Sequence, residues 1–547
     1  MKWLQTNWMK CLRPPFIQKA YCTHSPCGSK ERVFITTPIF YVNAAPHIGH
    51  LYTALLADAT ARFHRLHGKE VVFSTGTDEH GLKIQSSATK VNKTPKLYCD
   101  EIAAKFKALF DRTDVSYSHF IRTTDETHVS AVQNFWKILV KNDYIYQGKY
   151  EGWYSMADEE FLSEEEVCDQ RMETGESQKI SVSSGHPVVW VAEENYMFRL
   201  TKIKPKLLEW LNTGVIYPRE KRSQVDIALR NLQDLSVSRS RSRLSWGIPV
   251  PGDSTQTIYV WLDALINYLT VAGYPDHLQH WPADTQIVGQ DILKFHTIYW
   301  PAFLLAAGLD LPKQIVCHAH WTVDGYKMSK SRGNVVDPQE RMNKLTATGF
   351  RYFLLRSGTV FTNCNYDDAV AKDIINAELV NSYLNMLSRV SSKSINKHTI
   401  FPSFNEEDFQ TFFTKEERSM FNRLPDLIDI CNGYYNGLLC HKVSEAVFEY
   451  IRWSNKLFND HVPWKLCKDP ANDRHLHCLL HVTMETLRVC SILLQPLIPH
   501  IAGQVLDRLG ISKGDRLIKH CLERQLVHRI KDHPLQCQKN HIMQRIK

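Results

Sequence analysis

Short apolar runs alternate with segments of helical spacing over the N-terminal quarter of the chain. The predicted strands cover residues 33–35 and 71–73, and the predicted helices cover 51–67, 94–111 and 125–141. Gly68 is the stop signal of the first helix. Acidic residues in the stretch 74–81 follow the second strand, at the sheet edge where parallel α/β folds bind ligands. The alternation predicts the first half of a Rossmann-like nucleotide-binding domain.

The pattern becomes irregular between residues 119 and 240 and then resumes. The irregular part contains a hairpin-like aromatic segment, an acidic run and one helix, at 147–160, 164–166 and 204–211. Beyond Trp246 the α/β alternation returns, with strands at 286–288 and 314–318 and a helix at 292–306. We therefore predict that an insertion of ordinary domain size splits one parallel-sheet domain.

Beyond residue 371 the pattern is helical throughout. One segment has its buried face at three- and four-residue spacing, formed by Val443, Val447, Tyr450, Ile451, Ser454, Leu457 and Phe458. The residues after Gly514 are basic and polar with little periodicity. We expect an all-α helical bundle followed by a disordered or loosely held tail.

The composition fits a folded chain of three or four domains. Its 547 residues are 43% hydrophobic and 23% charged, which argues against disorder. The net charge of +8 permits a polyanionic partner without demanding one. No apolar run of roughly 18 residues occurs, so we expect no membrane span. The 14 cysteines form no C-x-x-C pair, so free thiols in a reducing compartment are expected.

Residues 1–30 have a composition of their own. They contain five Lys or Arg residues, no acidic residue and interspersed Trp, Leu, Phe and Ile. A basic, acid-free, loosely amphipathic segment is typical of a mitochondrial transit peptide, and the plainer alternative is a frayed basic N-terminus. We predict location in the mitochondrial matrix. A reporter fused to residues 1–35 that stayed in the cytosol would contradict this.

A histidine-bearing turn joins the first strand to the first helix. His47, Gly49 and His50 lie where unpaired backbone N–H groups and the positive end of the helix dipole collect. Gly49 lets a base or phosphate approach the backbone, and imidazoles can donate hydrogen bonds to phosphoryl oxygens. The turn predicts a phosphate site, although an ordinary helix start with two surface histidines explains it equally well.

A second basic turn lies far along the chain, in the stretch 324–334. Its Lys327 and Lys330 are three residues apart and lie between Gly325 and Gly333. A curled loop can direct both ammonium groups at one polyphosphate, and the flanking glycines suit a segment that moves. A solvated basic turn is the alternative.

Together and in this order, the two turns resemble the HIGH and KMSKS signatures of class I aminoacyl-tRNA synthetases. The resemblance implies that an amino-acid carboxylate attacks the α-phosphorus of ATP, with Mg²⁺ carried on the phosphates, and that a terminal tRNA hydroxyl then attacks the adenylate. It assigns catalysis to both histidines and both lysines. It assigns ATP binding to His47, Gly49, His50, Lys327, Ser329 and Lys330.

Two helix-like stretches bear aromatic stripes near predicted sheet edges. The stripes consist of Trp261, Leu265 and Tyr268 in the first stretch and of Ile292, His296 and Trp300 in the second. An aromatic box with a hydroxyl and an imidazole suits a long, polarisable thioether. Ordinary core packing is the alternative.

From about residue 33 to about residue 510 the chain is similar to methionyl-tRNA synthetases of the bacterial and mitochondrial branch. The matching stretches are 34–43, 76–81, 259–268, 289–300 and 320–338. The resemblance implies a methionine pocket lined by Ile39, Tyr41, Trp261, Ala264, Tyr268, Ile292, His296 and Trp300. It also implies that Asp78 meets the substrate ammonium and that Arg239 approaches the carboxylate or ATP.

The helical region resembles the anticodon-binding bundle of the same family. The implied anticodon contacts to tRNA(Met) are Asn385 and Arg389, one helical turn apart, and Trp464, on which a base can stack. A surface Asn/Arg pair and a packed Trp are also commonplace in helical proteins.

The chain departs from the family in two places. Many relatives carry zinc knuckles in the insertion, whereas Cys168 is the only cysteine there. One thiol cannot supply a four-ligand site, so we expect no zinc. The residues after about 515 do not resemble the family, and no tRNA-binding barrel is evident. Affinity for tRNA is therefore expected from the bundle and the lysine-rich surface.

The predicted organisation is a transit peptide (1–30), a Rossmann-like domain in two halves (31–118 and 241–325) around an insertion without zinc (119–240), a KMSKS and stem-contact region (326–370), a helical anticodon-binding domain (371–515) and a tail (516–547). We expect a monomer. One alternative is a class I synthetase for leucine, isoleucine or valine, although those usually carry a larger hydrolytic insertion. Another is a catalytically inactive relative that only binds RNA.

Overall fold

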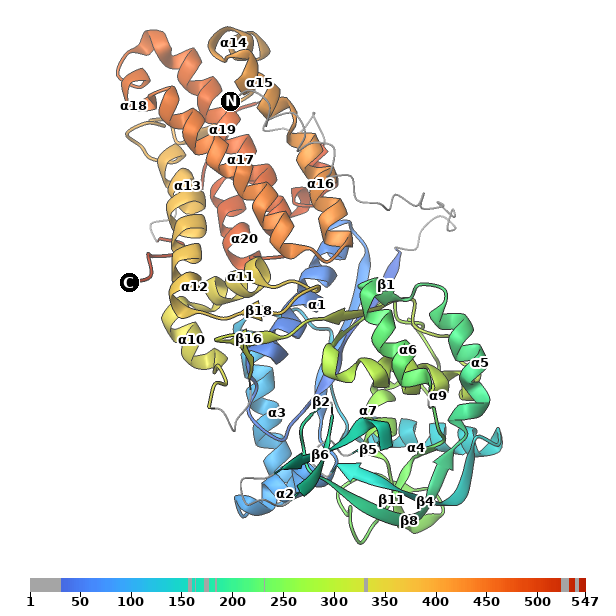
Figure 1. The fold of residues 1–547 in the computed structure, drawn as a ribbon. Coiled ribbons are helices and arrows are strands. Elements are labelled where there is room, and N and C mark those ends of the chain that lie inside the picture. Colours follow the sequence, from blue (N-terminus) through green and yellow to red (C-terminus); the bar gives the residue numbers. More distant parts are fainter. Residues whose placement is uncertain are drawn as a thin grey trace, which may run out of the picture.

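A six-stranded parallel sheet forms the centre of the computed structural model (Figure 1). The model describes residues 31–155, 160–162, 164–171, 177–182, 184–230, 232–328, 333–522, 531–536 and 541–547. The strand order is β3-β2-β1-β14-β15-β9, and every neighbouring pair is parallel. The strands are β1 (Arg32–Tyr41), β2 (Glu70–Asp78), β3 (His119–Arg122), β9 (Ile216–Tyr217), β14 (Thr285–Gly289) and β15 (Ile315–His318). The predicted Rossmann-like fold class is confirmed.

Helices cover both faces of this sheet. Ile287 and Val316 belong to the core shared with α1 (Ile48–Leu66) and α3 (Pro95–Arg112), whereas the next residues, Val288 and Cys317, belong to the core on the other face. That second core includes α4 (Glu126–Lys141), α5 (Leu200–Leu211) and α9 (Trp300–Ala307). Because successive strand residues point to opposite faces, a strand buried on both sides is a continuous apolar run.

The first and second halves of the sheet meet between β1 and β14. Ile35 pairs with Thr285 there, and the register of β1 against β2 shifts between Thr36 and Ile39, around Pro38. This is the point where the strand order reverses, and ligands of open α/β sheets bind in the crevice at the carboxyl ends of such strands.

The insertion forms an antiparallel sheet of its own. Strands β4 (Ile145–Ser155) and β8 (Val188–Phe198) pair along their whole length, flanked by β5 (Glu160–Leu162) and β10 (Leu235–Ser236), and β6 (Val167–Arg171) forms a hairpin with β7 (Ser177–Ser181). The predicted boundaries, 119 and 240, need correction. Strands β3 and β9 belong to the central sheet, and they are too short to show a periodic signal.

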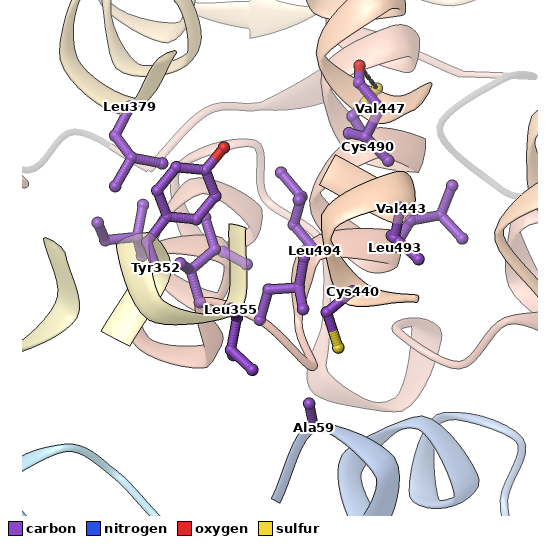
Figure 2. Packing of buried hydrophobic residues seen from close by; sticks show 14 of the residues in the cluster. Ala59, Tyr352, Leu355, Leu379, Cys440, Val443, Val447, Cys490, Leu493 and Leu494 are labelled. Carbon is purple, nitrogen blue, oxygen red and sulfur yellow. Dashed lines mark hydrogen bonds between the residues drawn. The ribbon is translucent and has the colours of Figure 1, made fainter. Parts of the chain in front are cut away.

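The helical domain packs around two long helices, α17 (Cys440–Asp460) and α19 (Asp473–Leu494), with α16 (Leu424–Asn436) and α20 (Pro499–Arg508) beside them (Figure 1). All seven residues of the predicted buried face of α17 are buried. Figure 2 shows that this core continues to Tyr352 and Leu355 of α11 (Ala347–Ser357) and to Ala59 of α1. The helical domain therefore shares one core with the helix that follows the histidine turn.

One described segment, Pro470–Leu494, is long and apolar enough to cross a membrane by length and composition. However, 94% of its apolar window is buried inside the molecule. Core helices of globular domains also have this length and composition, because a helix that is apolar on all sides is buried either in a protein core or in a membrane.

The described parts of the tail are folded against the helical domain, which corrects the predicted disorder for these residues. Strand β20 (His533–Pro534) pairs with β19 (Ile400–Phe401), and the Ile546 backbone exchanges two hydrogen bonds with the Asn376 side chain. Ile518, Cys521 and Leu535 are buried. These apolar residues are too irregularly spaced to form a sequence pattern. The predicted transit peptide lies outside the described residues.

Candidate active site

The histidine turn is a capped helix start. His47 is the N-cap of α1, where its Nδ1 accepts a hydrogen bond from Gly49 N at 3.1 Å, and His50 Nδ1 accepts from His47 N at 3.2 Å. The two rings stack with centroids 3.7 Å apart. Because each Nδ1 accepts, each neutral ring carries its proton on Nε2, as a hydrogen-bond donor. A Cβ at Gly49 would lie 2.9 Å from His47 Cε1, so a larger residue there would force the His47 ring to shift.

Lys327 approaches the same crevice from the strand β17 (Tyr326–Lys327). Its ammonium lies 2.8 and 2.9 Å from the two carboxylate oxygens of Asp291, and His320 Nε2 lies 3.4 Å from the same group. Partial burial acts to raise the pKa of Asp291, but hydrogen bonds and charges from His320 and Lys327 outweigh it and hold the pKa below its ordinary value. The lysine is therefore held by an ionised carboxylate. Ser329 and Lys330 lie outside the described residues.

A tyrosine and a histidine form the polar end of the predicted methionine pocket. Tyr268 Oη lies 2.7 Å from His296 Nε2, and His296 Nδ1 donates to Ile292 O at 2.9 Å. Since a carbonyl only accepts, Nδ1 carries the proton and Nε2 accepts from the tyrosine hydroxyl. Burial lowers the pKa of His296 to about 4 and raises that of Tyr268. Both groups are neutral at physiological pH, which suits an uncharged substrate side chain.

The aromatic wall comes from two irregular helical segments. The first helix-like stretch, which carries Trp261, Leu265 and Tyr268, forms two short helices, α7 (Val260–Leu265) and α8 (Asn267–Val271). The second stretch contains a π-helical turn, Phe295–Tyr299, which precedes α9. Trp261 stacks on Phe295 with centroids 3.6 Å apart and an interplanar angle of 15°. Single π-turns recur at functional sites because they re-aim side chains within a helix.

One cavity of about 480 Å³ brings most of the predicted residues together. It is lined by His47, Gly49, His50 and Lys327 from the two turns and by Ile39, Tyr41, Asp78, Trp261, Ala264, Tyr268, Ile292 and His296 from the predicted methionine pocket. Asp78 is the last residue of β2 and is 8% exposed. The volume is in the usual range for small-molecule sites.

Two predicted pocket residues do not line this cavity. Trp300 is fully buried behind Tyr268, with ring centroids 5.6 Å apart, and donates to Gln286. Arg239 is buried beside Tyr259, 4.4 Å from its ring, and its Nη1 donates to Ser236 and Ser238 O. In this structure the Arg239 side chain belongs to the base of the insertion, so its assigned substrate contact stays a prediction.

The cavity also contains polar residues that sequence analysis missed. They include Asn43, Lys83, Asp291, His318 and His320. His318 Nε2 lies 2.7 Å from Thr53 Oγ1 of α1, and burial lowers the pKa of His318 to about 4. Asp291 lies three residues after the predicted strand 286–288, so its place near a strand end was the available signal.

The predicted anticodon residues lie on the helical domain. Asn385 is exposed on α13 (Asn385–Val390), while Arg389 donates to Asn459 Oδ1 at 2.6 Å and lies 4.7 Å from the Phe458 ring. Trp464, on α18 (Pro463–Leu466), is 44% exposed. Asn459 is in the last turn of α17, and Trp464 follows that helix by four residues. Because Arg389 binds Asn459, Arg389 and Trp464 both lie near the C-terminal end of α17.

Comparison with known proteins agrees with this geometry. The family model described as tRNA synthetases class I (M) matches residues 33–391. The mitochondrial methionine–tRNA ligases of Xenopus laevis and Homo sapiens are 45% and 46% identical to this chain over 487 and 503 residues. These matches cover 88% and 89% of this chain, and 87% and 85% of the relatives.

A solved structure of the same family has the same fold as this chain. The methionyl-tRNA synthetase of Mycobacterium tuberculosis, in complex with methionyl-adenylate, superposes with a TM-score of 0.86 at 34% identity, covering 94% of this chain and 99% of that chain. The resemblance stated from the two turns is therefore confirmed. The chain belongs to the methionyl-tRNA synthetase family of class I aminoacyl-tRNA synthetases.

Proposed function

We propose that this chain is a methionine–tRNA ligase, which activates methionine with ATP and transfers it to the 3′ end of mitochondrial tRNA(Met). The observation that carries the proposal is the single cavity in which the histidine turn, Lys327, Asp78 and the Tyr268–His296 pair meet. These groups come from five separate segments of the chain, and only the fold brings them together.

The first step joins methionine to AMP. The methionine carboxylate attacks the α-phosphorus of ATP, a P–O bond to pyrophosphate breaks, and no protein nucleophile takes part. The Nε2–H groups of His47 and His50 and the ammonium of Lys327 donate to the phosphate oxygens, and Lys330 has the same role by its place in the motif. Asp78 holds the ammonium of methionine, and the neutral Tyr268–His296 pair receives the thioether.

Magnesium is proposed to enter on ATP, where it neutralises phosphate charge. The described residues contain no group of three or more His, Cys, Asp or Glu side chains that could hold a metal ion. The donors at the phosphate end are imidazole and ammonium groups, which bind phosphate oxygens, and the Asp291 carboxylate beside them is held by Lys327 and His320. This chain's residues therefore orient the nucleotide, and the ion is carried by the substrate.

The second step and the cellular setting complete the proposal. The terminal tRNA hydroxyl attacks the carbonyl of the methionyl-adenylate and releases AMP. Asn385, Arg389 and the exposed Trp464 are proposed to bind the anticodon. The domain division is proposed as predicted, except that strands β3 and β9 are counted with the central sheet. The protein acts as a monomer in the mitochondrial matrix after residues 1–30 have directed its import.

Methionine-dependent ATP–pyrophosphate exchange tests the activity directly. We expect exchange with methionine and little with leucine, isoleucine or valine, because the pocket ends in a neutral Tyr–His pair and not in an aliphatic surface. Exchange with leucine but not with methionine would favour the alternative class I synthetase. RNA binding without exchange for any amino acid would favour the inactive relative.

The lysine motif and the expected absence of zinc each have a simple check. Lys330→Ala should lower adenylate formation by roughly 10²–10³-fold while the circular dichroism spectrum stays unchanged. Normal exchange by this variant would remove the assigned role. Elemental analysis that found one stoichiometric zinc would contradict the expected absence of that metal.

A further inference from the structure

A buried carboxylate lies behind the wall of the candidate methionine pocket. Asp263 is fully buried on α7, between Trp261 and Ala264, which line the cavity. Its two oxygens bind different imidazoles: His80 Nδ1 lies 2.6 Å from Oδ2, and His128 Nε2 lies 2.8 Å from Oδ1. Burial acts to raise the pKa of Asp263, but the charges and hydrogen bonds of the two histidines outweigh it and hold the pKa below its ordinary value. Asp263 is therefore an ionised group with both oxygens occupied.

These three residues join segments that are far apart in the sequence. His80 follows β2 and lies two residues after Asp78, and His128 lies on α4. The second ring nitrogen of His128 lies 3.0 Å from Thr270 Oγ1 on α8, two residues after Tyr268. The network thus ties the strand end that carries Asp78 to both helices of the aromatic wall.

We infer that His80, Asp263 and His128 form a positioning brace that fixes the Asp78 carboxylate relative to the aromatic wall and so sets the affinity for methionine. The inference rests on the proposed function, because it takes Asp78 and the wall as the two ends of the amino-acid site. None of the three residues belongs to the described lining of the cavity. Their effect on the substrate is transmitted through the segments that they hold.

An ionic brace is effective because its hydrogen bonds to Asp263 do not tolerate movement of the segments that carry the two histidines. A buried carboxylate that loses one of its donors is left with an uncompensated charge, so each segment is held at hydrogen-bond distance from Asp263. An apolar contact at the same place would permit sliding. A shift of about 1 Å in the position of a binding group is enough to cost roughly 100-fold in rate.

Matched variants separate the brace from general folding effects. His80→Asn and His128→Gln keep an amide donor near the ring nitrogen that binds Asp263, whereas His80→Ala and His128→Ala remove it. Asp263→Asn removes the charge with almost no change in shape. His119→Ala, at an exposed position on β3, is the control.

The readout is pyrophosphate exchange, measured with methionine and ATP varied separately. We expect Asp263→Asn and both alanine variants to raise KM for methionine roughly 10- to 100-fold while KM for ATP stays within about threefold. The Asn and Gln variants and the control should stay within about threefold of the wild type for both substrates.

Three results would overturn the brace: equal increases of both KM values, donor-retaining variants no better than alanine, or a folded Asp263→Asn protein with the wild-type KM for methionine. If the alanine variants do not fold, the Asp263→Asn, His80→Asn and His128→Gln proteins decide alone. A wild-type protein without methionine-dependent exchange would refute the proposed function instead, so the two failures are distinguishable.

Discussion

His47 combines two roles at different atoms of one ring. Its Nδ1 caps α1 by accepting from Gly49 N, while its Nε2 is a donor at the helix N-terminus. Helix stability and the proposed phosphate binding therefore depend on different atoms of His47. Asparagine makes this separation possible, because its side-chain oxygen caps a helix well but cannot reproduce the second donor.

His47→Asn should leave the protein folded and lower its activity. We expect the free energy of unfolding to change by less than about 0.5 kcal/mol, since a good N-cap is retained. Adenylate formation should fall roughly 10²- to 10³-fold, because one donor to the phosphate charge is lost. Urea unfolding and single-turnover adenylate formation measure the two effects. A large loss of stability with unchanged activity would reverse the assignment.

His296 makes a second prediction, which concerns pH. Its pKa is about 4 in the folded protein and about 6.5 in the unfolded chain, so between these values only the unfolded chain takes up the proton. The free energy of unfolding should therefore fall as the pH drops from about 6.5 to about 4, with a share of roughly 3 kcal/mol from this residue. His296→Gln should show a smaller fall than the wild type in urea unfolding at pH 7 and pH 5. An identical fall would contradict the burial of a neutral imidazole.

The residues of the site could be predicted where the sequence carries a motif or a periodic aromatic stripe. The His47–His50 turn, Tyr268 and His296 have such signals, and the structure places them in one cavity. His318 and His320 were missed because each is a single polar residue near a strand end. Arg239 was assigned by resemblance alone, and it does not line the cavity, because its side chain takes a direction that no sequence pattern specifies.

At the scale of the element, the end of β2 determines where Asp78 lies. Gly76 of β2 pairs with Ile121 of β3, and a Cβ at Gly76 would lie 1.9 Å from Ile121 O. The two strands can approach this closely only because Gly76 has no side chain. The stretch that carries Asp78 could be predicted from the sequence. The short strands β3 and β9 and the π-turn could not, because they depend on tertiary contacts.

Gly76→Ala should force β2 and β3 apart. We expect a loss of about 1–3 kcal/mol in the free energy of unfolding from overpacking, together with an increased KM for methionine because Asp78 is two residues away. Gly503→Ala is the matched control: apart from the neighbouring backbone of α20, no atom of the described residues lies within 4 Å of the added Cβ. This change should therefore stabilise the helix by about 0.5–1 kcal/mol. Thermal or urea unfolding compares the two. Equal effects at both sites would show that the contact with Ile121 O does not matter.

At the scale of the whole molecule, one arginine joins the catalytic and helical domains. Arg351 on α11 is buried and bonds the Asp58 carboxylate of α1 at 2.5 Å, Leu497 O at 2.7 Å and Pro496 O at 2.8 Å. It also donates to the carbonyls of Thr113 and Asp114. This junction and the docked tail could not be predicted, because they join single residues from distant segments without periodicity.

Arg351→Lys should weaken this junction while keeping the charge. Lysine has three donors in place of five, so about two carbonyls lose their partners, and we expect a loss of about 2–4 kcal/mol in the free energy of unfolding. Charging of tRNA should fall further than pyrophosphate exchange, because charging needs the anticodon domain and the cavity in register. Arg356→Lys, which alters a half-buried pair with Glu378, is the control. Equal losses in both assays would contradict a role in domain orientation.

We propose that the histidine turn, the lysine-bearing turn at 324–334 and the aromatic pocket together hold one methionyl-adenylate. A crystal structure with a non-hydrolysable methionyl-adenylate analogue tests this most directly. We predict that the group replacing the phosphate lies within about 3.2 Å of Nε2 of His47 or His50, with the ammonium at Asp78 and the thioether beside Tyr268. An analogue bound away from the histidine turn, or with its methionine side chain directed to solvent, would contradict the account.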